Sequence, residues 1–457
     1  MENPSATLLY LFPVRDVDNS GTTDFVAYTS GGELLLYKGA AGRLPLASEG
    51  ERIGPAEKNS ITEFLAAGDW DGDNYPDIAV RLRIQGDTSA GNHEGYDISR
   101  LVVFWGNSNG NYSIQDTTRL ESGAQMWLAL IRGLGSDFDG DGVDDLLVSG
   151  LSGFTNGTVV RLPRMMIFRG HAGRRWGQVE ISRMADWRYW NPQPADFNAL
   201  MSLDQDQDGV KDIVLSKNGG SDASLSVLYG NIEGGLPDTT NTEYVALRNS
   251  GAGYSLFTDV TGDRIPDLLA CSGVANFVKV YVGFKGQRLL EQFGSGNDSA
   301  RPDEEQWWGK PWATISLPRK INPNWFGDDD RLFDLGDVNL DGIGDIFAFS
   351  WPYVMEYNGG NNLDSLADAI INITPGTEII TLKRLGNIDG SGRDIIALAT
   401  GTGIEFYAPT KTISSVGVPR RLPEGTGKAA AGDEDRERKR DGTGARPWLS
   451  SIQLITE

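Results

Sequence analysis

The sequence of 457 residues is short of cysteine, histidine and long apolar runs. Its one cysteine, Cys271, cannot form an internal disulfide. Its two histidines, His93 and His171, stand in glycine-rich polar surroundings and do not indicate a zinc site or a catalytic pair. No apolar stretch approaches the roughly 20 residues that a membrane-spanning helix needs, so we expect no membrane insertion.

Positive charge is scarce as well. The chain holds 41 lysines and arginines against 63 aspartates and glutamates, for a formal net charge of -22. This balance argues against a nucleic-acid partner, because a phosphate backbone is bound by a basic face. An acidic chain can instead bind metal cations, and the 58 glycines indicate a turn-rich, all-β fold.

The acidic residues gather in seven short segments that share the pattern Asp-x-Asp-x-Asp-Gly-x-x-Asp, with oxygen-bearing side chains at positions 1, 3, 5 and 9. We call these segments loops 1 to 7. The predicted ligands of the first six are Asp16, Asp18, Ser20 and Asp24; Asp69, Asp71, Asp73 and Asp77; Asp137, Asp139, Asp141 and Asp145; Asp204, Asp206, Asp208 and Asp212; Asp259, Thr261, Asp263 and Asp267; and Asp337, Asn339, Asp341 and Asp345. Loop 7, from Asn387 to Asp394, is one residue short, so its site is in doubt.

Short apolar runs flank every loop, as in Ile78–Val80 after loop 2, and a third run ends in an aromatic residue followed by glycine. Runs of about four to six branched and aromatic residues between glycines are typical of strands. The loops recur every 50 to 78 residues or so, which is room for four strands per repeat. The sequence predicts an all-β, seven-bladed β-propeller of four-stranded antiparallel blades. A solenoid of stacked sheets is the alternative, but it needs polar caps that the sequence lacks.

The loops have the chemistry of a calcium site. Calcium takes about six to eight oxygen ligands, whereas magnesium demands stricter octahedral geometry and keeps more water. Asp and Gly also favour turns, but that preference explains one or two such loops and not six. Crowded carboxylates repel each other unless a cation neutralises them. We expect about six Ca²⁺ ions, which would neutralise about half of the net charge.

The repeated loop and its flanking strands resemble the FG-GAP (VCBS-type) repeat of the integrin α-subunit propeller. The resemblance covers residues 7–408 or so and implies calcium in the loop between the first and second strands of each blade. It also implies a protein or glycan ligand without catalysis. Loop 7 departs from the family pattern, and no integrin-type leg domains follow. We divide the chain into a propeller (1–409), a charged, glycine-rich linker (410–447) and a strand-like C-terminal segment (448–457).

Tryptophan-rich insertions are the candidate ligand surface. Insertions at 83–100 and 149–164 fit connections between second and third strands, and two more, at 187–192 and 285–330, are expected between blades, on the face away from calcium. Clustered tryptophans suit sugars or a protein hot spot. They equally suit a plug of the channel or a seal between blades. The candidates are Trp187, Trp190, Trp307, Trp308 and Trp312.

We expect a non-catalytic interaction or adhesion module with a protein partner. A lectin of the same propeller class, or a structural subunit of a surface assembly, is the alternative. The chain has no nucleophile elbow and no histidine cluster, so we expect it not to be an enzyme, although lyases and phosphodiesterases of this fold exist. Charged and turn residues interrupt the apolar stretch 6–14, which does not resemble a signal peptide. We expect an extracellular, cell-surface or periplasmic location, reached through a trimmed leader or by another route.

Overall fold

The structure is a computed structural model that describes residues 8–407 together with Leu454–Ile455. The described range has gaps at 30, 55–59, 85–97, 121–131, 150–152, 156–157, 161–164, 178–184, 190–198, 218–223, 247–251, 273–276, 290, 292–310, 318–331, 334, 340, 351–352, 362, 365, 373–378 and 401–402. In the part of the chain so described, no helix has the length and apolar character needed to cross a membrane.

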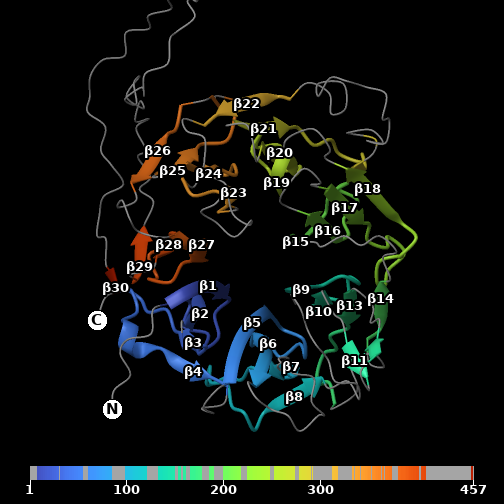
Figure 1. The fold of residues 1–457 in the computed structure, drawn as a ribbon, viewed down its shortest axis with the longest axis vertical. Helices are drawn as coiled ribbons and strands as arrows, with labels where there is room; N and C mark the ends of the chain where they lie inside the picture. The colour runs from blue at the N-terminus through green and yellow to red at the C-terminus, as the bar shows by residue number, and fades with distance from the viewer. Residues whose placement is uncertain are drawn as a thin grey trace, which may run out of the picture.

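Seven four-stranded antiparallel sheets form a ring of blades (Figure 1). The structure thus confirms the predicted all-β propeller. From the inner to the outer edge, blade 1 has β1 (Leu8–Val14), β2 (Asp24–Thr29), β3 (Leu34–Tyr37) and β4 (Glu51–Ile53), and blade 2 has β5 (Ser60–Gly68), β6 (Asp77–Ile84), β7 (Ile98–Phe104) and β8 (Thr117–Leu120). Blade 3 has β9 (Arg132–Ser136), β10 (Asp145–Ser149), β13 (Met165–Phe168) and β14 (Trp187–Tyr189).

Blade 4 has β15 (Ala199–Leu203), β16 (Asp212–Lys217), β17 (Ser224–Leu228) and β18 (Thr242–Ala246), and blade 5 has β19 (Ala252–Thr258), β20 (Asp267–Ser272), β21 (Phe277–Tyr281) and β22 (Ala313–Ser316). Blade 6 has β23 (Leu332–Phe333), β24 (Ile346–Ser350), β25 (Tyr353–Tyr357) and β26 (Ala369–Asn372), and blade 7 has β27 (Ile379–Gly386), β28 (Ile395–Thr400), β29 (Gly403–Tyr407) and β30 (Leu454–Ile455). A hairpin of β11 (Gly153–Thr155) and β12 (Thr158–Val160) lies between β10 and β13, and a short 3-10 helix, η1 (Ala47–Glu49), precedes β4.

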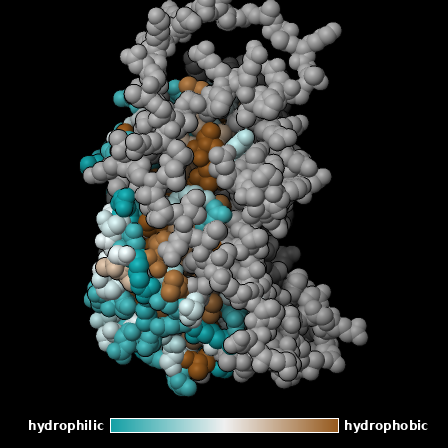
Figure 2. All heavy atoms as spheres, turned by 90° about the vertical axis from the view of Figure 1, so that its left-hand side faces the viewer, coloured by the Kyte–Doolittle hydropathy of each residue, from teal (hydrophilic) through white to brown (hydrophobic). Residues whose placement is uncertain are grey.

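The core lies between neighbouring blades. Each blade has a neighbour on both faces, so its strands can carry continuous apolar runs. Leu146 and Leu147 of blade 3 are adjacent in sequence and both fully buried. Phe138 and Leu147 of blade 3 pack with Ile213 of blade 4 in one such cluster. Seen from its edge, the described surface is hydrophilic along one side, with hydrophobic patches along its middle (Figure 2).

The ring closes where blade 7 meets blade 1. Leu11 and Phe25 pack against Leu385 and Phe406 in one buried cluster, and the rings of Phe25 and Phe406 meet edge-on with centroids 6.3 Å apart. The C-terminal segment pairs with blade 7, because β30 is its outer strand and lies antiparallel to β29. The C-terminal end of the chain therefore completes the last blade.

Candidate metal centres on one face of the ring

The acidic loops lie where the innermost strand of each blade turns into the second strand. Loop 2, for example, runs from Asp69 to Asp77 between β5 and β6. Because the strands of a blade are antiparallel, these loops emerge at the same face as the connections from third to fourth strands. We call this side the loop face, and its loops have the positions that the sequence predicted.

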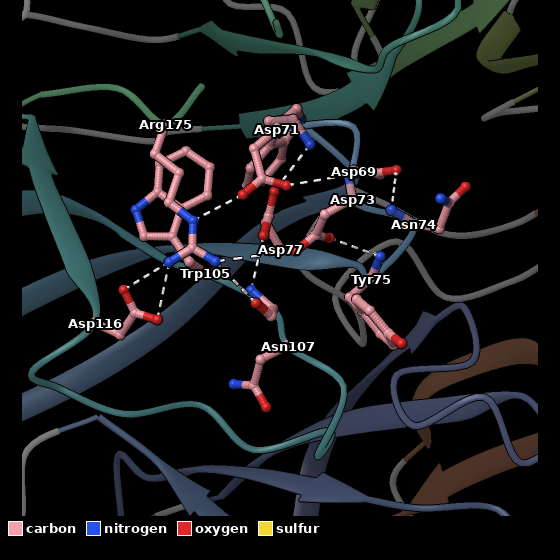
Figure 3. Close-up of polar contacts among 12 residues, drawn as sticks. Asp69, Asp71, Asp73, Asn74, Tyr75, Asp77, Trp105, Asn107, Asp116 and Arg175 are labelled. Carbon is pink, nitrogen blue, oxygen red and sulfur yellow. Dashed lines mark hydrogen bonds and ion pairs between the residues drawn. The ribbon is translucent and has the colours of Figure 1, made fainter. Parts of the chain in front are cut away.

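Within each loop the backbone curls around the first aspartate. In loop 2 the Asp69 carboxylate accepts the N–H of Asp73 at 3.0 Å and the N–H of Asn74 at 2.9 Å, and Asp73 accepts the N–H of Tyr75 at 2.9 Å (Figure 3). The sixth position needs a positive φ, which favours glycine. Asn74 and Arg264 adopt it without being glycine, at φ of 70° and 69°. Loop 5 therefore keeps the bend although it lacks the expected glycine.

Loops 5 and 6 repeat this geometry with a neutral side chain at position 3. Asp259 accepts the N–H of Arg264 at 2.7 Å, and Asp337 accepts the N–H of Gly342 at 2.7 Å. In loop 6 the Asn339 side-chain oxygen accepts the N–H of Asp341 at 2.9 Å. Both loops therefore repeat the curl around the first aspartate, although in loop 6 the Asn339 side-chain nitrogen also donates to Asp345 Oδ1 at 3.3 Å.

The closing aspartate at position 9 is a buried clamp. Asp77 is fully buried and accepts two backbone bonds, from the N–H of Trp70 at 2.9 Å and the N–H of Gly106 at 2.7 Å. The equivalent pair of donors serves Asp24, Asp145, Asp212, Asp267 and Asp345. We expected this residue to be only a metal ligand, but it also fastens the loop to the end of the third strand.

The glycine after the third strand is a functional residue that the sequence prediction treated only as a turn. A Cβ on Gly106 would lie closer than 3.0 Å to the carbonyl oxygen of Pro76, at position 8 of loop 2. The same clash with the position 8 carbonyl would arise at Gly39, Gly170, Gly230, Gly283 and Gly359. The recurrence of glycine two residues after the strand-ending residue was the available signal.

Burial and like charges make these carboxylates costly to ionise without a cation. Desolvation raises the pKa of Asp77 to about 8, with the charges of Asp71 and Asp73 adding to the rise. Desolvation and the charges of Asp71 and Asp69 also raise the pKa of Asp73. A bound cation would reverse this effect, because it stabilises the charged form.

Loops 1 to 4 each bring three carboxylates together. One oxygen from each of positions 1, 3 and 9 lies within 4.8 Å of the others, in the sets Asp16, Asp18 and Asp24; Asp69, Asp71 and Asp77; Asp137, Asp139 and Asp145; and Asp204, Asp206 and Asp212. Asp73, Asp141 and Asp208 at position 5 are not part of these groups. The structure therefore assembles four acidic clusters that could hold a metal ion.

In the part of the chain that the structure describes, two buried oxygens at position 3 have no hydrogen-bond partner. They are Asp206 Oδ1 in loop 4 and Thr261 Oγ1 in loop 5. A buried polar atom left without a partner is costly, so such atoms are normally satisfied by a group of complementary charge. A set of oxygens with unmet acceptor capacity fits a hard cation such as calcium.

Loop 7 lacks the buried clamp. Its Asp394 is 18% exposed and pairs with Arg384, which lies on the preceding strand β27. Asn387 still accepts the N–H of Gly392 at 2.8 Å. The missing residue before Asp394 thus removes the closing position while the rest of the curl survives.

The structure describes two of the five candidate tryptophans. Trp187 is buried between blades 3 and 4, where its Nε1 donates to the carbonyl of Pro237 at 2.5 Å. It belongs to the outer strand β14 rather than to a connection between blades, and its position fits the alternative of a seal between blades. Trp190, Trp307 and Trp308 lie outside the described residues.

Trp312 is 41% exposed and immediately precedes β22, the outer strand of blade 5. It therefore lies at the end of the connection from the third to the fourth strand, on the loop face. The expected placement away from the acidic loops is wrong for this residue, because the insertion enters its blade before the outer strand and not after it.

Comparisons with known proteins find distant structural matches at low identity. No family model matches the sequence, and no curated protein matches it. Among solved structures, a rhamnogalacturonan lyase of Bacillus licheniformis is 11% identical, with 89% of this chain and 90% of that chain covered and a TM-score of 0.35. An Agrocybe aegerita lectin that recognises non-reducing terminal N-acetylglucosamine is 14% identical, with 89% and 88% covered and a TM-score of 0.35. The rhamnogalacturonan lyase YesW is 12% identical, with 89% and 86% covered and a TM-score of 0.36.

These matches correct one expectation. We expected the chain not to be an enzyme, because it has few histidines and no nucleophile elbow. Rhamnogalacturonan lyases are nevertheless among the structures that the chain matches over most of its length. We therefore withdraw that expectation.

Proposed function

We propose that loops 1 to 6 bind calcium and that the ions stabilise a propeller that acts as a binding module for a protein ligand. The proposal includes that the blades are FG-GAP-type repeats and that the protein is located outside the cell or in the periplasm. Extracellular calcium modules work at dissociation constants of about 10⁻⁴ to 10⁻³ M. About six ions would also relieve much of the charge repulsion within the acidic loops.

The calcium proposal rests on Asp206 Oδ1. This atom is buried, its residue belongs to the acidic cluster of loop 4, and it accepts no hydrogen bond from any residue that the structure describes. Asp204, Asp206 and Asp212 would hold the ion in loop 4, with Asp208 at the exposed rim. The cluster of three carboxylates has one paired guanidinium, that of Arg288, and a bound ion would add the positive charge needed to neutralise the rest. Asp212 meanwhile keeps its two backbone bonds, to Gln205 and Gly230, so the same residue fixes both the ion and the blade.

A ligand surface on the loop face fits the exposed apolar side chains there. Ile232, Phe284 and Trp312 are 71%, 54% and 41% exposed, and all three lie in connections from third to fourth strands of blades 4 and 5. Exposed aromatic and aliphatic side chains suit a protein partner, and a tryptophan also suits a sugar ring. A glycan array with the wild type and Trp312→Ala would separate a glycan ligand from a protein ligand.

Chelation tests the calcium proposal. Each site adds about 2.7 kcal/mol to the free energy of unfolding at a hundredfold excess of ligand over its dissociation constant. We expect excess chelator to lower the Tm markedly and calcium to restore it better than magnesium. Isothermal titration should count about six ions, and a Tm that chelator leaves unchanged would refute the proposal.

A further inference from the structure

An arginine from blade 3 reaches across to loop 2 of blade 2. Arg175 Nε donates to Asp71 Oδ2 at 2.7 Å, and its Nη1 bonds both oxygens of Asp116 at 2.8 and 2.9 Å (Figure 3). The guanidinium lies 5.3 Å from the ring centroid of Trp105, and its Nη2 donates to the carbonyl of Gly106 at 3.2 Å. Its Nη2 also lies 4.0 Å from Asp73 Oδ2, so five groups of blade 2 contact one side chain of blade 3.

Blades 4 and 5 repeat the arrangement. Arg288 Nε donates to Asp206 Oδ2 of loop 4 at 3.1 Å, and its Nη1 donates to Asn241 Oδ1 at 2.7 Å. Its guanidinium lies 4.2 Å from the ring centroid of Tyr229. Each arginine follows a glycine whose N–H donates to the carbonyl of the same loop aspartate, from Gly173 to Asp71 and from Gly286 to Asp206.

Loop 3 obtains a guanidinium by a different route. Arg169, at the end of strand β13 in the same blade, pairs with Asp139 Oδ2. It occupies the place that Trp105 and Tyr229 hold in blades 2 and 4, directly before the glycine that follows the third strand. Loops 2, 3 and 4 thus each have a guanidinium on the aspartate at position 3.

In Asp71 and Asp206 the guanidinium bonds Oδ2 and does not bond Oδ1. Asp71 and Asp206 are only 4% and 5% exposed, so their carboxylates cannot be oriented by water alone. Asp71 Oδ1 accepts the N–H of Asp73 at 3.3 Å, and Asp206 Oδ1 has no partner. In both residues the arginine bonds Oδ2 and leaves Oδ1 available to a cation.

We propose that Arg175 and Arg288 are positioning residues for the cation sites of loops 2 and 4, and that they couple cation binding to the docking of the next blade. The inference rests on the proposed calcium function. Partners that orient metal ligands change metal affinity by about 10- to 100-fold when they are removed. An arginine that only replaced the cation would instead weaken binding by its presence.

The test compares Arg175→Met, which keeps the apolar stem over Trp105, with Arg174→Met as the matched control. Arg174 is the exposed neighbour, and its side chain makes no ion pair with any residue that the structure describes. Terbium replaces calcium in oxygen sites and is excited by nearby aromatic side chains, so the loop 2 signal is taken as the part of the emission that an Asp69→Ala variant loses. We expect Arg175→Met to weaken terbium binding at loop 2 by about 10- to 100-fold and Arg174→Met to leave it unchanged.

Further measurements separate this role from simpler ones. Arg175→Met in an Asp71→Asn background should cause no additional loss of affinity. An equal drop in Tm with calcium and with chelator, at unchanged terbium affinity, would assign Arg175 to blade docking alone and overturn the proposal. Tighter binding in Arg175→Met would show that the arginine competes with the cation, which also overturns it. A wild type that binds neither calcium nor terbium would refute the calcium function itself.

Discussion

Loops 2 and 7 have the same curl and differ in how they close. Asp77 of loop 2 is fully buried and clamped by two backbone N–H groups, whereas Asp394 of loop 7 is partly exposed and paired with Arg384. Both loops nevertheless dock on the following blade in the same manner. The N–H of Gly173 donates to the carbonyl of Asp71 at 2.6 Å, and the N–H of Gly42 donates to the carbonyl of Asp389 at 2.8 Å.

Docking between blades therefore depends on backbone carbonyls and needs no complete acidic set. Loop 7 performs it with Asp389 while lacking the clamp at position 9. The crowded carboxylates of loop 2 then require a separate reason, since they raise each other's pKa and cost stability in the absence of a cation. The proposed cation binding would supply that reason.

The largest expected effect is a pH dependence that exists only without metal. Burial raises the pKa of the six closing aspartates to about 6 to 8; they are Asp24, Asp77, Asp145, Asp212, Asp267 and Asp345. A raised folded-state pKa stabilises the fold at low pH, and this stability is lost as the pH rises through the folded-state pKa. In chelator we expect a higher Tm at pH 5 than at pH 8. Saturating calcium should abolish or reverse this trend, and a chelated protein that is equally stable at both pH values would contradict it.

The closing residues of loops 2 and 7, Asp77 and Asp394, should differ in how much they contribute to the free energy of unfolding. In calcium at neutral pH, Asp77→Ala leaves two buried N–H groups without an acceptor, at about 1–3 kcal/mol each. Asp394→Ala removes a partly exposed ion pair and should cost about 1 kcal/mol or less. Urea unfolding of both variants measures the difference. Equal losses would show that loop 7 is closed as firmly as loop 2.

The third strand of blade 6 differs from those of the other blades, because it carries a buried glutamate. Glu356 is buried, has no partner for either carboxylate oxygen, and has a pKa raised well above its usual range by desolvation. At the same distance before the glycine the other blades carry Leu36, Val103, Ile167, Val227 and Val280. We expect Glu356→Val to raise the free energy of unfolding by about 1–3 kcal/mol.

Glu356→Gln is the control, because an amide keeps the buried polar group and should bring little gain. Both variants are measured by thermal unfolding at pH 8. At this pH a buried carboxyl group costs the most stability, because ionisation is favoured in the unfolded chain. A loss of stability in Glu356→Val would show that the glutamate has a partner that stabilises the fold.

The last comparison is at position 5, where the readout is metal stoichiometry and not stability. Asp141→Ala removes an exposed carboxylate from a complete loop and should lower the number of calcium ions bound by one. Asp389→Ala, in the shortened loop, should leave that number unchanged. Isothermal titration measures both, and the opposite order would identify loop 7 as an intact site and loop 3 as a defective one.

Sequence alone was enough for the repeat, the number of blades and the position of the acidic loops. The spacing of aspartates and the alternation of apolar runs with glycine are local patterns, and local patterns decide strands and turns. Sequence also singled out loop 7, because one missing residue moves Asp394 out of register.

Only the tertiary structure decided which side chains meet across blades. Arg175 is 104 residues from Asp71 in sequence, and Arg288 is 82 residues from Asp206. No periodic pattern predicts such pairs, because they depend on how one blade's connection lies on the next blade's loop. The same holds for Trp187, which local composition offered as a ligand surface and packing between blades made part of the core, and for β30, which reaches blade 7 from the far end of the chain.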